Sequence, residues 1–160
     1  MRQIQAKKLT VQGFAPYGSY MDILHPEGSC LGDFYNDKVL YHVSGNMPVG
    51  FSTLICRKPE QQIVTKAEYH NTTGEAMLVM DDDVILHVAP PTGEPCPERT
   101  EAFIVPMGTL IAIKTGVWHM GVMPLTKEEA HVLIVLPERV YKNDCSVSEY
   151  KEEDFIEILS

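Results

Sequence analysis

Two separate stretches of the chain carry acidic and imidazole side chains at spacings that suit a metal site. Glu68 and His70 lie two positions apart, and Glu75 follows after a Thr-Thr-Gly turn. His119 comes later, at the end of a Gly-Val-Trp-His segment. Two carboxylates and two imidazoles form a mixed oxygen and nitrogen donor set, which suits Mn, Fe, Ni or Zn better than an ion that prefers thiolates. The sequence therefore predicts one divalent transition metal, held by Glu68, His70, Glu75 and His119.

Each of these side chains also has an ordinary structural explanation. A histidine in an apolar segment often hydrogen-bonds to a backbone carbonyl, and a glutamate on a strand usually faces solvent. Burial distinguishes the two explanations, because a carboxylate inside a barrel stays charged most readily beside a metal or another cation. The metal hypothesis is favoured because four such groups occur together.

The four side chains can meet only if strands direct them into one interior. Residues two apart on a strand face the same side of a sheet, so Glu68 and His70 would point together. Glu75 begins the next apolar run after the turn and can fold back beside them. His119 follows another strand-length run, 109–113. The site therefore requires a strand-rich fold.

The apolar runs of the chain have the length and composition of β-strands. They favour β-branched residues or alternation, and Pro and Gly, which occur 11 times each, punctuate them. The runs cover residues 39–43, 51–56, 62–65, 76–80, 84–88, 102–105, 109–113 and 131–136. This count and spacing predict an all-β fold, either a sandwich or a jelly-roll barrel.

Helix is expected to be scarce. Residues 148–156 are predicted to form one or two helical turns with Ser148 as the cap, and residues 9–17 to hold a short helix. The acidic triplet at 81–83 is interpreted as a solvated hairpin turn rather than a calcium loop, because it is short and lies between two strands.

Composition and charge exclude several classes of function. The 160 residues suffice for one domain, and we expect a single domain over 1–160. The net charge of −9 and the lack of a Lys/Arg cluster argue against a nucleic-acid partner. No apolar run is long enough for a membrane helix or a signal peptide. The four cysteines form no C-x-x-C pair and are expected to be reduced thiols, so a cytoplasmic location is predicted.

The spacing of the acidic and imidazole residues resembles the two motifs of the cupins. Cupins carry His-x-His, three or four residues and then Glu, followed later by Pro-x-Gly and a further His. Here the matching residues are Glu68, His70, Glu75, the Pro106–Gly108 turn and His119. The first ligand is Glu instead of His, and the last His comes later than usual. The resemblance implies a double-stranded β-helix that holds one metal.

A narrower resemblance, over most of the chain, is to the ureidoglycolate lyase family, a cupin branch of purine and allantoin catabolism. The residues that carry it are Leu9-Thr10, Phe14, Tyr17-Gly18, Arg57, Glu68, His70, Glu75, Val117-Trp118-His119 and Asn143-Asp144-Cys145. The sequence departs from the family at Asn71, Ile113, Lys114 and Met120, where the family has Pro, Tyr, His and His.

The resemblance implies cleavage of ureidoglycolate, or a similar small hydroxy-acid adduct, to glyoxylate and urea. Glu68 or Glu75 would move the proton, and Lys114 or Arg57 would hold the substrate carboxylate. Trp118 is expected either to contact the substrate or to fill the barrel mouth. The family also implies a homodimer, with residues 1–35 packing on the barrel or on a partner subunit.

Two other functions remain open from the sequence. A non-catalytic cupin could bind a small anionic metabolite, which would explain the departures at Ile113, Lys114 and Met120. A cupin isomerase or dioxygenase could act on a sugar or keto acid, because the fold alone does not fix the reaction.

Overall fold

Short strands dominate the chain because β-branched and aromatic residues alternate with polar ones between Gly- and Pro-containing turns. The computed structural model describes residues 1–40, 42–43 and 45–160. Its strands are β1 (Arg2–Gln5), β2 (Lys7–Lys8), β3 (Gly18–Asp22), β4 (Val49–Arg57), β5 (Ile63–Val64), β6 (Lys66–Tyr69), β7 (Glu75–Val79), β8 (Val84–Ala89), β9 (Glu101–Val105), β10 (Thr109–Ile113), β11 (Trp118–His119), β12 (Met123–Pro124), β13 (Glu129–Pro137), β14 (Ser146–Glu149) and β15 (Ile156–Leu159). Two short α-helices occur among the described residues, α1 (Val11–Phe14) and α2 (Val140–Asn143).

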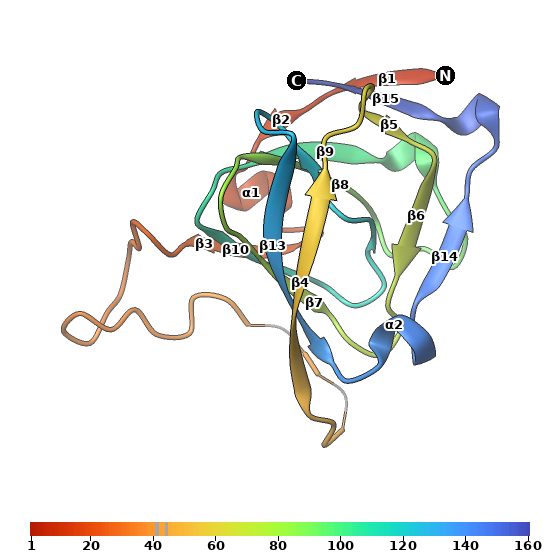
Figure 1. Ribbon diagram of the computed structural model, residues 1–160. Helices are drawn as coiled ribbons and strands as arrows, with labels where there is room; N and C mark the ends of the chain where they lie inside the picture. Colours follow the sequence, from red (N-terminus) through yellow and green to blue (C-terminus); the bar gives the residue numbers. More distant parts are fainter. Residues whose placement is uncertain (41, 44) are drawn as a thin grey trace.

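The strands of the barrel pair as one long antiparallel ribbon rolled on itself. The pairs β4 with β13, β6 with β11, β7 with β10 and β8 with β9 are nested in chain order. Rolling this ribbon gives two facing sheets, ordered β3-β10-β7-β13-β4 and β14-β6-β11-β8-β9-β2 (Figure 1). Nested pairing of this kind is the jelly-roll topology, so the predicted all-β jelly-roll barrel with little helix is confirmed.

Large apolar side chains fill the space between the two sheets. Phe14 of α1 packs edge-on against Phe103 of β9, with ring centroids 5.5 Å apart. The other buried members of this core are Leu9, Tyr17, Cys56, Met77, Val79, Val84, Leu86, Val88, Val105, Ile111, Ile113, Val117, Val122, Ala130 and Val132. The predicted helix within 9–17 is confirmed as α1, whose N-cap Thr10 accepts a hydrogen bond from the Gly13 amide.

A third, small sheet covers the outer face of the β6-containing sheet. Its order is β1-β15-β5, and both chain termini lie beside it (Figure 1). Val64, Ile156 and Ile158 from this sheet pack against Ile85 of β8 and Ala102 of β9. The first 22 residues therefore pack on the barrel of their own chain, through β1, β2, α1 and β3.

Two predicted elements differ from the structure. Residues 148–156 were predicted helical, yet Ser146–Glu149 form β14 and pair with β6, and only Glu152–Asp154 form a 3₁₀ turn. Pairing with an available sheet edge outweighs the weak local preference for helix. The described residues of the 39–43 run lie outside any strand, and Tyr41 lies outside the described residues. This run belongs to the connection from β3 to β4. The His42 carbonyl oxygen accepts hydrogen bonds from the Gly74 amide and the Thr73 hydroxyl, so the run contacts the barrel without forming a strand.

The acidic triplet fastens the β7–β8 connection to neighbouring segments. Asp82 accepts hydrogen bonds from the amides of Thr126 and Lys127, and Asp83 accepts one from the Met107 amide. Asp81 accepts a hydrogen bond from the His131 amide. The predicted solvated hairpin is wrong, because β7 and β8 belong to different sheets and the turn connects them, with Asp82 buried. Within the described residues, no helix has the length and apolar character needed to cross a bilayer.

Candidate metal centre

Three buried polar side chains meet inside the barrel from different strands. His70 directly follows β6, His119 is in β11, and Glu75 begins β7 in the facing sheet. The β6–β11 register places His119 opposite Glu68. Because side chains alternate along a strand, Glu68, His70 and His119 face the interior while Trp118 faces outward. The fold therefore brings the two motifs of the sequence together as their spacing predicts.

The ligand atoms of His70, Glu75 and His119 lie close enough to share one ion. Oε2 of Glu75 is 2.9 Å from Nε2 of His70 and 3.4 Å from Nε2 of His119. One ligand atom from each residue lies within 4.8 Å of the others. The three residues are 3%, 7% and 2% exposed, respectively. Such a buried group of two imidazoles and one carboxylate can hold a divalent transition metal.

Backbone carbonyls orient both imidazole rings. Nδ1 of His70 is 2.7 Å from the carbonyl oxygen of Asp144, and Nδ1 of His119 is 2.8 Å from that of Val117. A carbonyl oxygen only accepts, so each Nδ1 carries a hydrogen and donates it. A neutral ring then has its lone pair on Nε2, the atom nearest Glu75, so a hydrogen bond from Nε2 to Glu75 requires that the ring also carry a proton there. Donation from Nδ1 to a carbonyl is the arrangement by which outer hydrogen bonds prepare histidines for a metal.

The charge of Glu75 is stabilised by the two rings. Burial alone would raise the pKa of Glu75, but hydrogen bonds from His119 and His70 lower it to about 2. Burial also opposes charge on His70, yet its hydrogen bond to Glu75 raises its pKa overall. An Nε2 lone pair can face a carboxylate only across a cation, which is either a proton or a metal ion. The site therefore favours binding of a cation.

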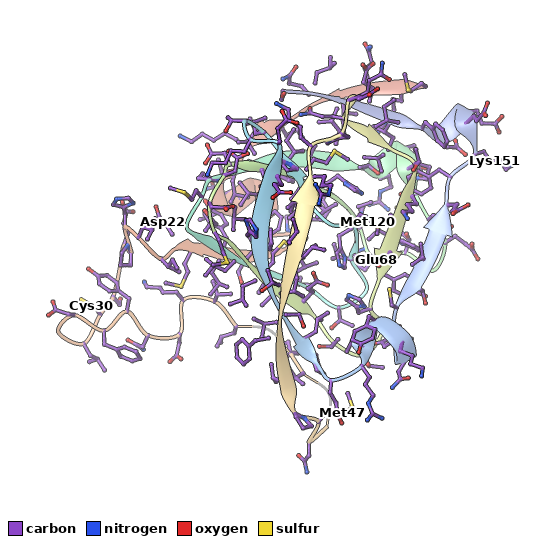
Figure 2. All side chains as sticks on the ribbon, in the orientation of Figure 1. Asp22, Cys30, Met47, Glu68, Met120 and Lys151 are labelled. Atoms are coloured by element: carbon purple, nitrogen blue, oxygen red, sulfur yellow. The ribbon has the colours of Figure 1, made fainter. Side chains whose placement is uncertain are left out.

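Glu68 lies beside the three-residue group but outside it. It is half-buried, and its Oε2 accepts a hydrogen bond from the Cys145 thiol over 2.9 Å. Burial, followed by this hydrogen bond, raises the pKa of Cys145 to about 12, so the thiol keeps its proton. Figure 2 shows Glu68 between β6 and β4, whereas Cys30 and Met47 lie outside the barrel. Its carboxylate is thus available for a role other than metal binding.

An open cavity of about 560 Å³ leads to this group. Glu68, His70 and Glu75 lie at its inner end. Apolar side chains from β4 and β13 line one wall, and the segment around α2 forms the rim. The remaining lining residues are Gly50, Ser52, Thr53, Leu54, Gly121, Ile134, Leu136, Pro137, Glu138, Arg139, Tyr141 and Cys145. The volume suits a small metabolite.

Comparison with known proteins agrees with this geometry. The family model described as ureidoglycolate lyase matches residues 1–157. The chain belongs to the ureidoglycolate lyase family. A protein of Agrobacterium fabrum named "Putative ureidoglycolate lyase" is 27% identical over 131 residues, which cover 78% of this chain and 77% of that protein. Membership confirms the predicted family and a lyase-type enzyme.

A solved structure, RmlC from Streptococcus suis in complex with dTDP-D-xylose, is similar over part of the barrel. The match has a TM-score of 0.41 and 12% sequence identity, and it covers 56% of this chain and 44% of that one.

The structure places two predicted carboxylate-binding residues away from the cavity. Lys114 is exposed, donates to the carbonyl oxygen of Ala15 and lines a different cavity beside His42. The side chain of Arg57 is 80% exposed and pairs with Glu129 across β4 and β13. Arg57 ends β4 and Lys114 directly follows β10, and neither is among the residues that line this cavity, so neither position suits the role expected of it.

Trp118 is also directed away from the metal-binding group. Its indole is buried on the outer face of the β6-containing sheet, where it packs against Tyr69 with ring centroids 4.5 Å apart. Its Nε1 donates to the carbonyl oxygen of Thr92. Trp118 therefore has a packing role, but on the outer face of the sheet and not in the barrel mouth as one of the two expectations had it.

The family departures lie outside the residues that line the cavity. Ile113 is part of the barrel core, and Lys114 occupies the position already described. Met120 is half-buried and, among the described residues, is not part of the cavity lining. The β10–β7 register nevertheless places Ile113 beside Glu75, so this departure neighbours the three-residue group.

Sequence reasoning missed Arg139, which lines the rim of the cavity. It is the N-cap of α2, two residues after the end of β13, and has a left-handed backbone, with φ of 60°. A chain reversal at a non-glycine residue leaves little trace in the sequence. The nearby Asn143-Asp144-Cys145 match was the one available signal that this segment lies near the site.

Proposed function

We propose that this protein is a divalent-metal-dependent lyase that cleaves ureidoglycolate, or a closely similar hydroxy-acid adduct, to glyoxylate and urea. The observation that carries the proposal is the buried group of His70, Glu75 and His119 at the inner end of an open cavity. Its chain belongs to the ureidoglycolate lyase family.

The residues present fit a bound metal ion. Both Nδ1 atoms are occupied by carbonyls, and both Nε2 atoms converge on one carboxylate oxygen. His70, Glu75 and His119 would hold the ion, and the nitrogen-rich donor set favours Ni, Mn, Zn or Fe. When bound, the ion would act as a Lewis acid that lowers the pKa of the substrate hydroxyl.

Glu68 is positioned to move the proton. Its carboxylate takes the proton from the substrate hydroxyl, the C–O bond becomes a carbonyl, and the C–N bond breaks with its electron pair on nitrogen. Glu68 then returns the proton to that nitrogen, which releases urea and glyoxylate. The Cys145 thiol hydrogen-bonds to the carboxylate and fixes its orientation.

Metal analysis and turnover measured together test the proposal. Wild-type protein is incubated with each of the four metals, desalted and analysed by elemental mass spectrometry, and glyoxylate release from ureidoglycolate is then followed. We expect about one metal ion per chain and metal-dependent turnover. The His119→Ala variant should lose both.

The matched control is His25→Ala, because His25 is exposed and, among the described residues, pairs with Asp22 at the surface. This variant should keep metal and turnover at the wild-type level. If His119→Ala retains full metal content, the ligand assignment is wrong. Metal binding and glyoxylate binding without turnover would instead support a non-catalytic metabolite-binding protein.

A further inference from the structure

The rim of the cavity contains the positively charged side chain of Arg139, whose position suits recognition of a substrate carboxylate. We infer that Arg139 binds the carboxylate of the substrate and makes the site specific for small carboxylates. The inference rests on the proposed function to the extent that the ligand is a small hydroxy acid. It replaces Arg57 and Lys114, which lie outside the cavity, in that role.

The first argument is the charge of the cavity. Glu68 and Glu75 lie at its inner end and Glu138 lies at its rim, in a chain with a net charge of −9. The proposed divalent ion would offset two of these three negative charges, so a further cation at the cavity is needed to favour entry of a small carboxylate. Among the described residues that line the cavity, Arg139 is the only lysine or arginine.

The second argument is that the guanidinium is available. Within the described part of the chain it makes no hydrogen bond or ion pair, whereas Arg57 pairs with Glu129 and Arg2 donates to three backbone carbonyls. A guanidinium binds a carboxylate through two parallel N–H donors, which gives direction as well as attraction. Arg139 can therefore accept a ligand carboxylate without first breaking a contact within the protein.

The third argument is how the backbone holds Arg139. A left-handed backbone is unfavourable for a residue with a Cβ, and such residues are often found at functional sites. Here the carbonyl oxygen of Arg139 accepts hydrogen bonds from the amides of Lys142 and Asn143, at 2.9 and 3.0 Å. The next residue, Val140, is 2% exposed and anchors the turn.

The fourth argument is that the same segment contacts the metal-binding group. Five residues after Arg139, the carbonyl oxygen of Asp144 accepts the Nδ1 hydrogen of His70. One residue further, the Cys145 thiol donates to Glu68. The segment 139–145 therefore links the rim cation to the inner end of the cavity, so that one ligand can be held at both places.

Binding and kinetics in a set of matched variants test the inference. Arg139→Met removes the charge. Arg139→Lys keeps the charge but cannot form the bidentate hydrogen bond of a guanidinium. Arg57→Met is the control, because it removes an equal charge outside the cavity. Calorimetry measures binding of glyoxylate and of its uncharged amide, and steady-state kinetics follow ureidoglycolate. Metal content and melting temperature are measured for every variant.

In Arg139→Met we expect glyoxylate affinity to fall, and KM for ureidoglycolate to rise, by about tenfold or more. Binding of the amide and metal content should stay unchanged. Arg139→Lys should recover part of the loss, and Arg57→Met should stay within about twofold of the wild type. Equal values for Arg139→Met and Arg57→Met would overturn the inference.

These outcomes are distinguishable from failure of the proposed function. If the wild type binds glyoxylate but does not cleave ureidoglycolate, the lyase proposal fails while the binding comparison still tests Arg139. If the wild type cleaves ureidoglycolate and Arg139→Met matches it in KM and in glyoxylate affinity, the lyase proposal stands and Arg139 has no part in recognition.

Discussion

Glu75 is a charged carboxylate buried between two imidazoles, and this position makes it the residue on which metal binding depends most directly. Glu75→Gln keeps the size of the side chain and removes its charge. We expect metal affinity to fall by about 100-fold or more, since loss of an outer partner alone costs 10- to 100-fold. Competition against a fluorescent chelator measures the affinity. A Gln variant with wild-type affinity would show that Glu75 is not a ligand.

Glu68 differs from Glu75 in that it lies outside the three-residue group. Glu68→Gln should therefore keep its metal while kcat falls by about 10²- to 10⁴-fold, which is the usual contribution of a positioned proton-transfer group. Elemental analysis and steady-state kinetics on the same preparation separate the two effects. The exposed residue Glu60 provides a matched control, because Glu60→Gln makes the same change of charge away from the site. Joint loss of metal and activity in Glu68→Gln would make Glu68 a ligand.

The clustering of the candidate metal ligands was predictable because their relative positions follow from strand geometry. Residues two apart on a strand share a face whatever the rest of the fold, so Glu68 and His70 could be placed together from spacing alone. The position of Arg139 depends on a chain reversal after β13, and that of Arg57 depends on which end of β4 meets the cavity. Neither property is encoded by local spacing.

At the scale of elements, strands with an apolar run of their own were predictable from the sequence. Strands that form only because they pair with a distant strand were not. Residues 109–113 coincide with β10, because this run is apolar and bounded by turns. Residues 146–149 carry one apolar side chain, Val147, among three polar ones and become β14 only through the free edge of β6. Their conformation is decided by a neighbour far away in the sequence, which local propensity does not report.

The β7–β8 connection is held to the chain before β13 by Asp82. Its buried carboxylate accepts hydrogen bonds from the amides of Thr126 and Lys127 and from the Thr126 hydroxyl. Asp82→Asn should lower the free energy of unfolding by about 2 kcal/mol, because the Asn side chain has one acceptor oxygen where the buried carboxylate has two, and it loses the charge that strengthens these hydrogen bonds. Chemical denaturation measures the loss, with the exposed Asp33→Asn as the control. Equal stability of the two variants would contradict this role.

The same carboxylate predicts a pH dependence. Burial opposes the charge of Asp82, but hydrogen bonds from Thr126 and Lys127 lower its pKa overall. A carboxyl whose pKa is lower in the folded state contributes stability above its unfolded pKa, about 3.9, and loses it as the pH falls further. The difference in stability between wild type and Asp82→Asn should therefore be largest near neutral pH and shrink below about pH 4. A difference that grew on acidification would contradict the assignment.

At the scale of the whole molecule, the two sheets of the barrel differ in what covers them. The small sheet β1-β15-β5 packs on the outer face of the β6-containing sheet. On the other sheet, Phe51 and Ile55 of the edge strand β4 are 71% and 51% exposed. The register places Val135 of β13 beside Phe51 on the same face. Contiguous apolar side chains on a sheet edge are usually covered by another chain.

The homodimer expected from the family remains a prediction, and this face is where we place it. An edge strand can pair with its own copy across a two-fold axis, because the same groups then meet from both sides. Light scattering after gel filtration should give twice the chain mass of 17.9 kDa for the wild type. Phe51→Glu combined with Ile55→Glu should give the chain mass, because two charges on each copy would have to be buried at the contact. The control is Met107→Glu, at an exposed turn before β10, which should remain dimeric. A wild-type monomer, or a double variant that still forms dimers, would show that this face does not join two chains.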